Sequence, residues 1–240
     1  MNSGARVNPA PSIVIIPTFN EAENIGSLLL QITRDMPSLH VLVVDDQSTD
    51  GTRSILERFT TQDSRIHLLT RNHKAGLAGA YIAGFDWAID KGYAQCVQMN
   101  GDLTHDPLYL QPLLEGLNHH DVMVGCRTEK GHGSQHWNRG QIKAIQTGNY
   151  LARRLLQLPT RDLGSRFVAW KTATLVAIAY HQIRSRGYAF QAELKAKAHR
   201  AGFRVGEISV PFASRRFGQT KTPKTDFAQA AYRIIKLRYS

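Results

Sequence analysis

The sequence predicts an α/β protein built on a mostly parallel, doubly wound sheet. Short apolar runs rich in β-branched residues alternate with segments of helix length through the first half of the chain. These runs are apolar throughout, as expected for strands that are buried on both faces of a parallel sheet. Such a sheet is covered by helices on both sides.

The expected elements follow one another closely. Before residue 128 we expect strands at residues 12–16, 41–44, 66–69, 95–99 and 121–125, and helices at 21–34, 50–59, 76–90 and 107–117. After residue 128 the alternation changes. A Gly/His/Ser loop is followed by an amphipathic helix at 139–156, a strand at 167–170, a helix at 190–201, a strand at 204–210 and a last helix at 227–237.

The length of 240 residues favours a single domain. We expect a flexible tail at 1–11, a single domain at 12–225 and an amphipathic C-terminal helix at 226–240. In that helix the apolar side chains lie on one side and the basic ones largely on the other. Two interpretations remain open for it: packing on the domain's own core, or binding at a membrane surface.

Charge is distributed unevenly along the chain. The net charge is +11, and residues 195–240 carry eleven Lys or Arg against two acids. This positive charge indicates either a surface that binds phosphate, anionic lipid or nucleic acid, or a basic surface that is only exposed to solvent. No recognised nucleic-acid motif is present, so nucleic acid is not expected as a partner.

The cysteine content and the apolar runs favour a cytoplasmic location. Cys96 and Cys126 form no disulfide framework or metal-binding spacing. We see no secretory signal, and no apolar run approaches the roughly 20 residues that a spanning helix needs.

Distinctive polar residues follow three of the expected strands, at 17–21, 45–52 and 100–107. The carboxyl ends of parallel strands meet at one edge, where ligands bind. Asn20, Ser48 or Thr49 are also suited to cap helices, and Asp50-Gly51 to turn the chain. Adjacent carboxylates, however, repel each other. They suit ribose hydroxyls, a base edge or a cation on a diphosphate. The glycine-rich dinucleotide and P-loop signatures are absent.

Taken in order, the motifs resemble those of the inverting family-2 glycosyltransferases and, within that family, the dolichol-phosphate or polyprenol-phosphate mannosyltransferases. They read Pro-Thr-Phe-Asn-Glu at 17–21, Val-Val-Asp-Asp-x-Ser-x-Asp-Gly-Thr at 43–52, Asp-Leu-Thr-His-Asp-Pro at 102–107, Gly-Tyr-Ala-Phe-Gln-Ala-Glu at 187–193, and a basic segment at 212–221.

The resemblance implies a GT-A fold and an inverting transfer of a sugar to a polyprenyl phosphate. The donor is a nucleotide-diphosphate sugar, with GDP-mannose as the first choice and a glucose donor as the second. The enzyme would work peripherally at the cytoplasmic membrane face. The alternatives are a family-2 transferase with another acceptor, or a degenerate homologue that only binds a nucleotide-sugar.

The resemblance also implies roles for individual residues. The nucleotide site would be lined by Pro17, Phe19, Glu21, Val44, Asp46, Asn100 and Gly101. The catalytic residues would be Asp102, Arg127, Arg139, Arg215 and Lys221. The four cationic ones would hold phosphates, for which arginine offers two parallel hydrogen bonds and lysine a point charge. Mg²⁺ or Mn²⁺ would bind at Asp102, and weakly at Asn100.

The chain departs from the family pattern at two places. Asn100 stands where the family usually has an aspartate, so it keeps a carbonyl oxygen but loses a charge, which weakens binding of a hard cation. In the segment 162–168, Arg166 replaces a glycine and Val168 an arginine, which predicts an altered acceptor side. His105 lacks partners at ligand spacing, so we expect it to form local hydrogen bonds rather than to bind metal.

Overall fold

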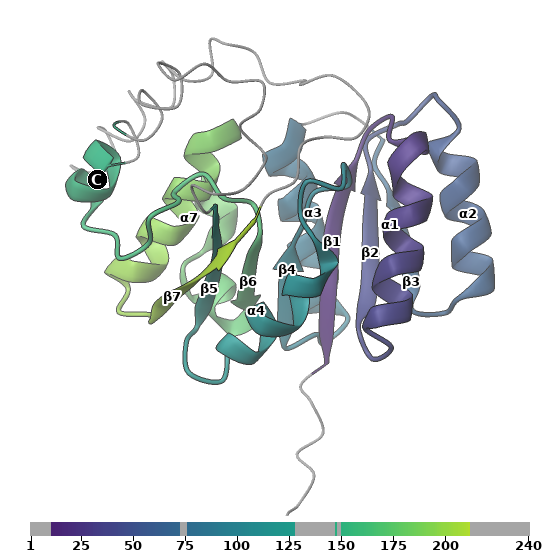
Figure 1. Cartoon of the computed structure of the whole chain (residues 1–240). Coiled ribbons are helices and arrows are strands. Elements are labelled where there is room, and N and C mark those ends of the chain that lie inside the picture. Colours follow the sequence, from purple (N-terminus) through teal and green to yellow (C-terminus); the bar gives the residue numbers. More distant parts are fainter. Residues whose placement is uncertain (1–10, 73–75, 128–146, 148–149, 212–240) are drawn as a thin grey trace, which may run out of the picture.

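The computed structural model describes residues 11–72, 76–127, 147 and 150–211 (Figure 1). Residues 1–10 of the expected tail at 1–11 lie outside these residues, and so does the expected C-terminal helix at 226–240. Within the described part of the chain, no helix is long and apolar enough to cross a membrane.

Seven strands form one sheet in the order β3-β2-β1-β4-β6-β5-β7. Their bounds are β1 Ser12–Thr18, β2 His40–Asp45, β3 Ile66–Thr70, β4 Gln95–Gln98, β5 Val122–Arg127, β6 Val168–Lys171 and β7 Val205–Val210. Strands β3, β2, β1 and β4 pair in parallel, and so do β5 and β7. Strand β6 is antiparallel to both of its neighbours, β4 and β5. All the other strands therefore run in the same direction.

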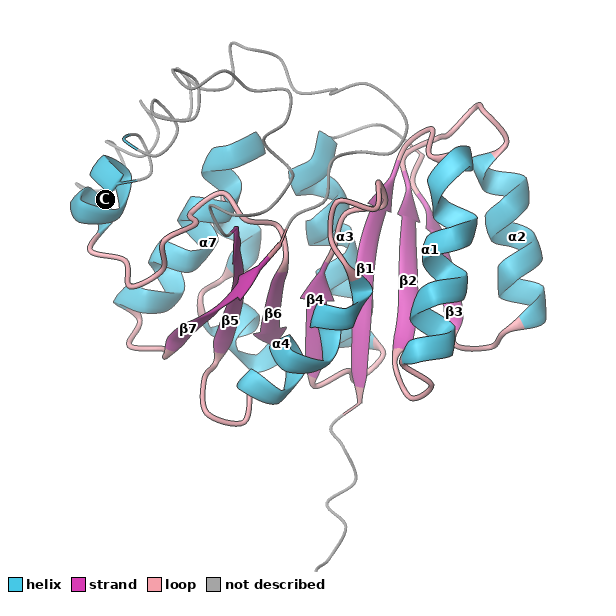
Figure 2. Cartoon of the chain, in the orientation of Figure 1, coloured by secondary structure: helices cyan, strands magenta, loops and turns pink. Residues whose placement is uncertain are grey.

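Helices cover both faces of the sheet (Figure 2). On one face lie α1 (Ala22–Asp35), α2 (Thr52–Gln62) and α4 (Leu110–Gly116). On the other lie α3 (Gly76–Asp90), α6 (Thr172–Ala177) and α7 (Gly187–Arg200). Short 3-10 turns occupy Pro107–Tyr109 and Tyr180–Gln182, and residues 150–156 are also helical.

The apolar runs form strands because both of their faces are buried. The β1 side chains Ile13 and Ile15 face the layer of α3, whereas Val14 and Ile16 face α1. All four have no exposed surface. Since successive side chains of a strand point to opposite faces, an unbroken apolar run is what a two-sided core requires.

The sequence predicted the fold class and most of the elements correctly. All seven strands were expected, with ends that differ from the observed ones by one or two residues. Two features were not predicted: the short helix α6 and the reversed direction of β6. Of the helix expected at 139–156, the structure describes only 147 and 150–156.

The close packing of α3 on β1 yields a test of the fold. A β-carbon at Gly84 would overlap Cγ2 of Ile15, whereas one at Gly26 in α1 would lie an ordinary 3.7 Å from Ile55 and Phe59. We expect Gly84→Ala to lower the free energy of unfolding by about 1–3 kcal/mol, because a packed core resists added volume. Chemical denaturation measures the change.

Gly26→Ala is the matched control for Gly84→Ala. A glycine in a helix interior costs about 0.5–1 kcal/mol relative to alanine. The control variant should therefore be as stable as the wild type or more stable. Equal stability of the two variants would contradict the packing of α3 on β1.

Candidate active site

The three expected loops meet at the carboxyl edge of the sheet. The first joins β1 to α1, the second joins β2 to α2, and the third follows β4. The Asp46 N–H donates to the carbonyl oxygen of Thr18 at 2.9 Å, which connects the first two loops. A β-carbon at buried Gly101 would lie 3.6 Å from the Pro17 oxygen and the Thr18 hydroxyl oxygen, so the third loop packs against the first.

Two reciprocal hydrogen bonds lock the first loop to the second. The Asn20 N–H donates to Ser48 Oγ at 2.9 Å, and the Thr49 N–H donates to Asn20 Oδ1 at 2.8 Å. Asn20 has a positive φ of 54°, a conformation that asparagine tolerates better than most residues. These polar residues therefore serve the loop structure.

Asp50 holds the first turns of two helices. Its carboxylate accepts hydrogen bonds from the Ala22 N–H at 3.1 Å and from the Thr52 N–H at 3.1 Å, at the starts of α1 and α2. Burial acts to raise the pKa of Asp50, but these bonds and the Thr52 hydroxyl outweigh it and lower the pKa. Gly51 follows with a φ of 93°. The interpretation of Asp50-Gly51 as a turn is therefore correct, and the capping contacts of Asp50 were not predicted.

The adjacent carboxylates Asp45 and Asp46 are stabilised in different ways. Asp45 is fully buried and accepts hydrogen bonds from the Ser48 hydroxyl at 2.5 Å and the Ser48 N–H at 3.2 Å. Asp46 forms an ion pair of 2.7 Å with Arg71, which follows β3. Both side chains of this pair are at most 10% exposed. Hydrogen bonds and an opposite charge thus offset the repulsion that two neighbouring carboxylates create.

The loop after β4 is organised by Thr104. Its hydroxyl donates to Asp102 Oδ1 at 2.6 Å and accepts from the side-chain amide of Asn100 at 3.1 Å. The Thr104 N–H also donates to Asp102 Oδ1 at 3.2 Å. Asn100 and Asp102 are therefore fixed relative to each other, on either side of Gly101.

His105 lies beneath this loop. Its Nδ1 accepts a hydrogen bond from the Asn100 N–H at 3.1 Å, and its ring stacks on Phe167 with 4.7 Å between centroids. Burial lowers the pKa of His105 to about 3, although the Asp102 carboxylate acts to raise it. The histidine is thus neutral and shapes the loop, so the expectation of a local hydrogen-bonding role is confirmed.

A partly buried ion pair joins the end of β5 to the segment before β6. Arg127 Nε and Nη2 donate to the two oxygens of Asp162 at 2.7 and 3.1 Å. The Asp162 side chain is 6% exposed and that of Arg127 is 39% exposed. Burial acts to raise the pKa of Asp162, but the Arg127 guanidinium outweighs it and lowers the pKa. Arg127 thus reaches the surface while Asp162 fixes its orientation.

Lys195 binds the backbone of the same segment before β6. This α7 residue has no exposed surface, and its ammonium donates to the carbonyl oxygens of Leu163 and Ser165, both at 2.8 Å, and of Asp162 at 3.3 Å. Burial lowers the pKa of Lys195 to about 8, although Asp162 acts to raise it. One buried cation therefore fixes three carbonyl groups of the turn that carries Asp162.

The donor set for a metal ion at this site is small. Among the described residues, no group of three or more His, Cys, Asp or Glu is placed to hold an ion. Residues 100–102 of the third loop offer one carboxylate, of Asp102, and one amide oxygen, of Asn100. Mg²⁺ is often held by one or two carboxylates together with substrate phosphates. These residues therefore fit a divalent ion that takes its other ligands from phosphate and water, and that would neutralise a leaving diphosphate.

The other predicted site residues fall into three groups. Pro17, Phe19 and Glu21 are half-buried at the edge, where the Glu21 carboxylate accepts from Asn24 at 2.9 Å. The Val44 side chain is fully buried in the core below α3, so it can line a nucleotide site only through its backbone. A third group lies outside the described residues: Arg139, Arg215 and Lys221.

Sequence reasoning gave no role to three residues that organise the site: Arg71, Asp162 and Lys195. Arg71 directly follows strand β3, just as predicted site residues follow β1, β2 and β4. Its position after a strand could therefore have indicated that it belongs to the site. The pairing of Asp162 and the burial of Lys195 depend on contacts across 30 or more positions of the chain.

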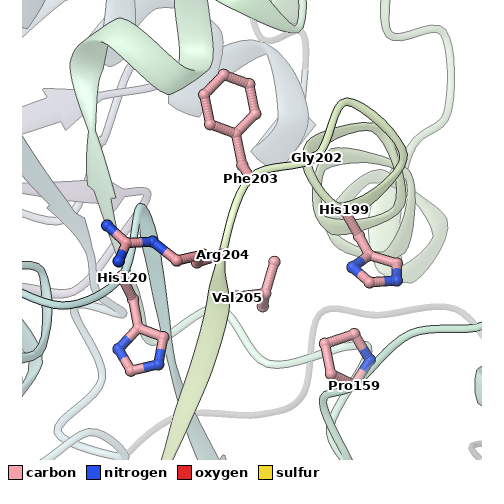
Figure 3. A pocket seen from close by; sticks show the side chains of 7 residues that line it. All are labelled: His120, Pro159, His199, Gly202, Phe203, Arg204 and Val205. Atoms are coloured by element: carbon pink, nitrogen blue, oxygen red, sulfur yellow. The ribbon is translucent and has the colours of Figure 1, made fainter.

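A surface pocket lies at the opposite edge of the sheet (Figure 3). It is formed by the end of α7, the start of β7 and the loop before β5, and its lining residues are His120, Pro159, His199, Gly202, Phe203, Arg204 and Val205. Because it lies at the amino ends of the parallel strands, this pocket is separate from the three loops.

The fold and the loops define a class of protein, the nucleotide-binding α/β proteins with acidic loops at the carboxyl edge of a Rossmann-like sheet. Residues 13–177 match glycosyl transferase family 2. The chain belongs to this family, and the expected glycosyltransferase class is thereby confirmed.

Two curated relatives resemble nearly the whole chain. Polyprenol monophosphomannose synthase of Mycolicibacterium smegmatis is 34% identical over 97% of this chain and 89% of its own length. Undecaprenyl-phosphate mannosyltransferase of Micrococcus luteus is 35% identical over 87% of this chain and 86% of its own length.

Solved structures share the fold at low sequence identity. Glucosyl-3-phosphoglycerate synthase from Mycobacterium tuberculosis, solved with Mn²⁺, UDP and glucosyl-3-phosphoglycerate, has a TM-score of 0.66 at 17% identity, over 95% of this chain and 78% of that one. The mannosyltransferase PcManGT from Pyrobaculum calidifontis, solved with GDP-Man and Mn²⁺, has a TM-score of 0.61 at 17% identity, over 96% and 70%. The expected GT-A fold is confirmed.

Lys195 provides a test of how the site is held. Lys195→Met leaves three carbonyl groups without their donor, and a buried unsatisfied polar group costs about 1–3 kcal/mol. We expect a clear loss of unfolding free energy in urea. Lys197→Met on the same helix removes a single contact of 3.3 Å, to Ile178, and should have a much smaller effect.

The pH dependence of stability tests the protonation of Lys195. The folded protein binds its proton with a pKa of about 8, below the ordinary 10.5 of an exposed lysine. Between these values the unfolded chain holds more protons, so this group makes the free energy of unfolding rise with pH. The stability difference between wild type and Lys195→Met should therefore grow from about pH 8 upwards. A constant difference would contradict the lowered pKa.

Proposed function

We propose that this protein transfers mannose from GDP-mannose to a polyprenyl phosphate, with inversion at the anomeric carbon. The observation that carries the proposal is the alignment of two mannosyltransferases of polyprenyl phosphates over nearly the whole chain, at 34% and 35% identity. The three loops that carry the family motifs lie together at the edge where such a sheet binds ligands.

The donor would bind across the loops after β1, β2 and β4. Glu21 and Asp46 offer carboxylates for the hydroxyls and amines of a nucleoside, although Asp46 already pairs with Arg71. The diphosphate would lie at the loop of Asn100, Gly101 and Asp102, where Asp102 and the Asn100 amide oxygen would hold Mg²⁺ or Mn²⁺ and the ion would neutralise phosphate charge.

The acceptor is itself the nucleophile. A phosphate oxygen of the lipid attacks the anomeric carbon, the bond from that carbon to the diphosphate oxygen breaks, and the diphosphate leaves with the electron pair. A phosphate is already ionised at neutral pH, so the site needs charge neutralisation and placement rather than a strong base. Arg127, positioned by Asp162, would serve this purpose together with Arg139, Arg215 and Lys221.

The lipid acceptor requires contact with a membrane surface. A peripheral position at the cytoplasmic face follows from the proposal, with the basic C-terminal segment at 226–240 facing anionic headgroups. Co-sedimentation with phosphatidylglycerol vesicles at low and high salt measures this association. Equal binding to neutral vesicles would contradict an electrostatic attachment.

The reaction is tested by incubating the purified protein with labelled GDP-mannose and a polyprenyl phosphate in detergent, with Mg²⁺, Mn²⁺ or EDTA. Label in the lipid extract supports the proposal. Label only from UDP-glucose would change the donor. Transfer only to a water-soluble phosphate would change the acceptor. Tight nucleotide binding without any transfer would indicate a homologue that has lost catalysis.

Asp102 gives the sharpest test of the assigned roles. We expect Asp102→Asn to lower the transfer rate at least tenfold, about 1.4 kcal/mol in the barrier, because the carboxylate that would hold the metal ion is lost. Asp106→Asn is the matched control. Asp106 lies in the same loop and accepts from the Leu108 N–H at 3.0 Å, a capping role that asparagine fills equally well. Equal rates in both variants would refute the role of Asp102.

A further inference from the structure

Asn100 and Arg166 each lie two positions beyond the Gln98–Val168 pair that ends the ladder between β4 and β6. Strands β4 and β6 pair in antiparallel register, with Gln98 opposite Val168. Continuing this register by two positions would bring residue 166 opposite residue 100. The chain still follows the sheet here, because the Gly125 N–H donates to the Phe167 carbonyl oxygen at 2.8 Å.

Continued past the ladder, the alternation of side chains would also place both residues on the same face of the sheet. Trp170 and Val168 of β6 belong to the core layer of α3, and Trp170 Nε1 donates to Gln98 Oε1 at 2.9 Å on that side. Side chains alternate along a strand, so Asn100 and Arg166 would continue this row. The two family departures, a lost carboxylate and a gained guanidinium, would thus occupy neighbouring positions.

The guanidinium of Arg166 is held close to the third loop. Its positive charge acts on two buried rings there, Tyr81 and His105. Burial is the main cause that raises the pKa of Tyr81 and lowers that of His105. The charge of Arg166 acts to lower both pKa values, so it opposes burial at Tyr81 and acts together with burial at His105. The Asp102 carboxylate acts on the same two rings with the opposite sign.

No ion pair with a described residue neutralises the charge of Arg166. The residue is half-buried, and among the described residues no hydrogen bond or ion pair engages its guanidinium. By contrast, Arg71 and Arg127 each pair with a carboxylate at the same edge. A partly desolvated arginine without an acidic partner is suited to a bidentate contact with an anion.

We propose that Arg166 binds the diphosphate of the nucleotide-sugar donor. Because Asn100 stands in place of a carboxylate, the site holds a metal ion less strongly, and Arg166 supplies positive charge that the ion would otherwise provide. The inference rests on the proposed function, because that function places the diphosphate at residues 100–102. Donor binding is then less dependent on metal than in a site with two carboxylates.

Calorimetric titration of the full chain with GDP and with guanosine, in EDTA, tests the assignment. We expect Arg166→Gln to weaken GDP binding at least tenfold and to change guanosine binding less than twofold, since only GDP carries the diphosphate. The matched control is Arg58→Gln, which removes an exposed arginine from α2 and should leave both affinities unchanged.

The outcomes separate this inference from the proposed function. If the wild type binds neither GDP nor UDP, the proposed function fails and takes the inference with it. Two results would refute only the role of Arg166 when the wild type binds GDP. In the first, Arg166→Gln binds GDP as tightly as the wild type. In the second, Arg166→Gln loses affinity for guanosine by the same factor as for GDP. Should Arg166→Gln fail to fold by circular dichroism, Arg166→Lys replaces it. Arg166→Lys keeps the charge but loses the fork, so it should weaken GDP binding several-fold, and an unchanged affinity refutes the role.

A second variant tests the link to the metal. Asn100→Asp restores the carboxylate at this position, so GDP binding in EDTA should fall relative to the wild type and Mn²⁺ should raise it by a larger factor. The readout is the ratio of GDP affinities with and without Mn²⁺. A ratio equal to that of the wild type would overturn the proposal that Arg166 and Asn100 together reduce the need for metal.

Discussion

The reversed direction of β6 is the constraint on which the site depends. A parallel strand brings to the functional edge the residues that follow it, whereas an antiparallel strand brings those that precede it. Because β6 lies between β4 and β5 and runs against both, the segment 162–167 arrives at the edge where the loops after β1, β2 and β4 meet. Residues from both halves of the chain therefore share one site.

The structure holds this segment with buried charges rather than with apolar packing alone. Asp162 pairs with Arg127, and the ammonium of Lys195 bonds to the carbonyl oxygens of Asp162, Leu163 and Ser165. Removing one member of such a set leaves the others unsatisfied, so the arrangement has one favourable geometry. The side chains that face the ligand edge are consequently fixed before any ligand arrives.

How much could be predicted depended on the range of the interactions. Strands such as β1 and β2 were identified because unbroken apolar runs followed by polar residues are local signals. The direction of β6 was not predicted, since four residues contain no information on which way a strand enters a sheet. The Asp46–Arg71 pair and the buried Lys195 were missed because their partners are distant in sequence. For Asp50-Gly51 the local interpretation as a turn was correct.

The double contact of Asp50 has a further consequence, for local opening of the fold. One carboxylate accepts from the first turn of α1 and from the first turn of α2, which are 30 positions apart. The start of α1 thus depends on a residue that directly precedes α2, so displacement of Asp50 leaves both first turns without this acceptor. The amide protons of both first turns should exchange with solvent as one cooperative unit, and a nucleotide bound at this edge would slow the exchange of both together.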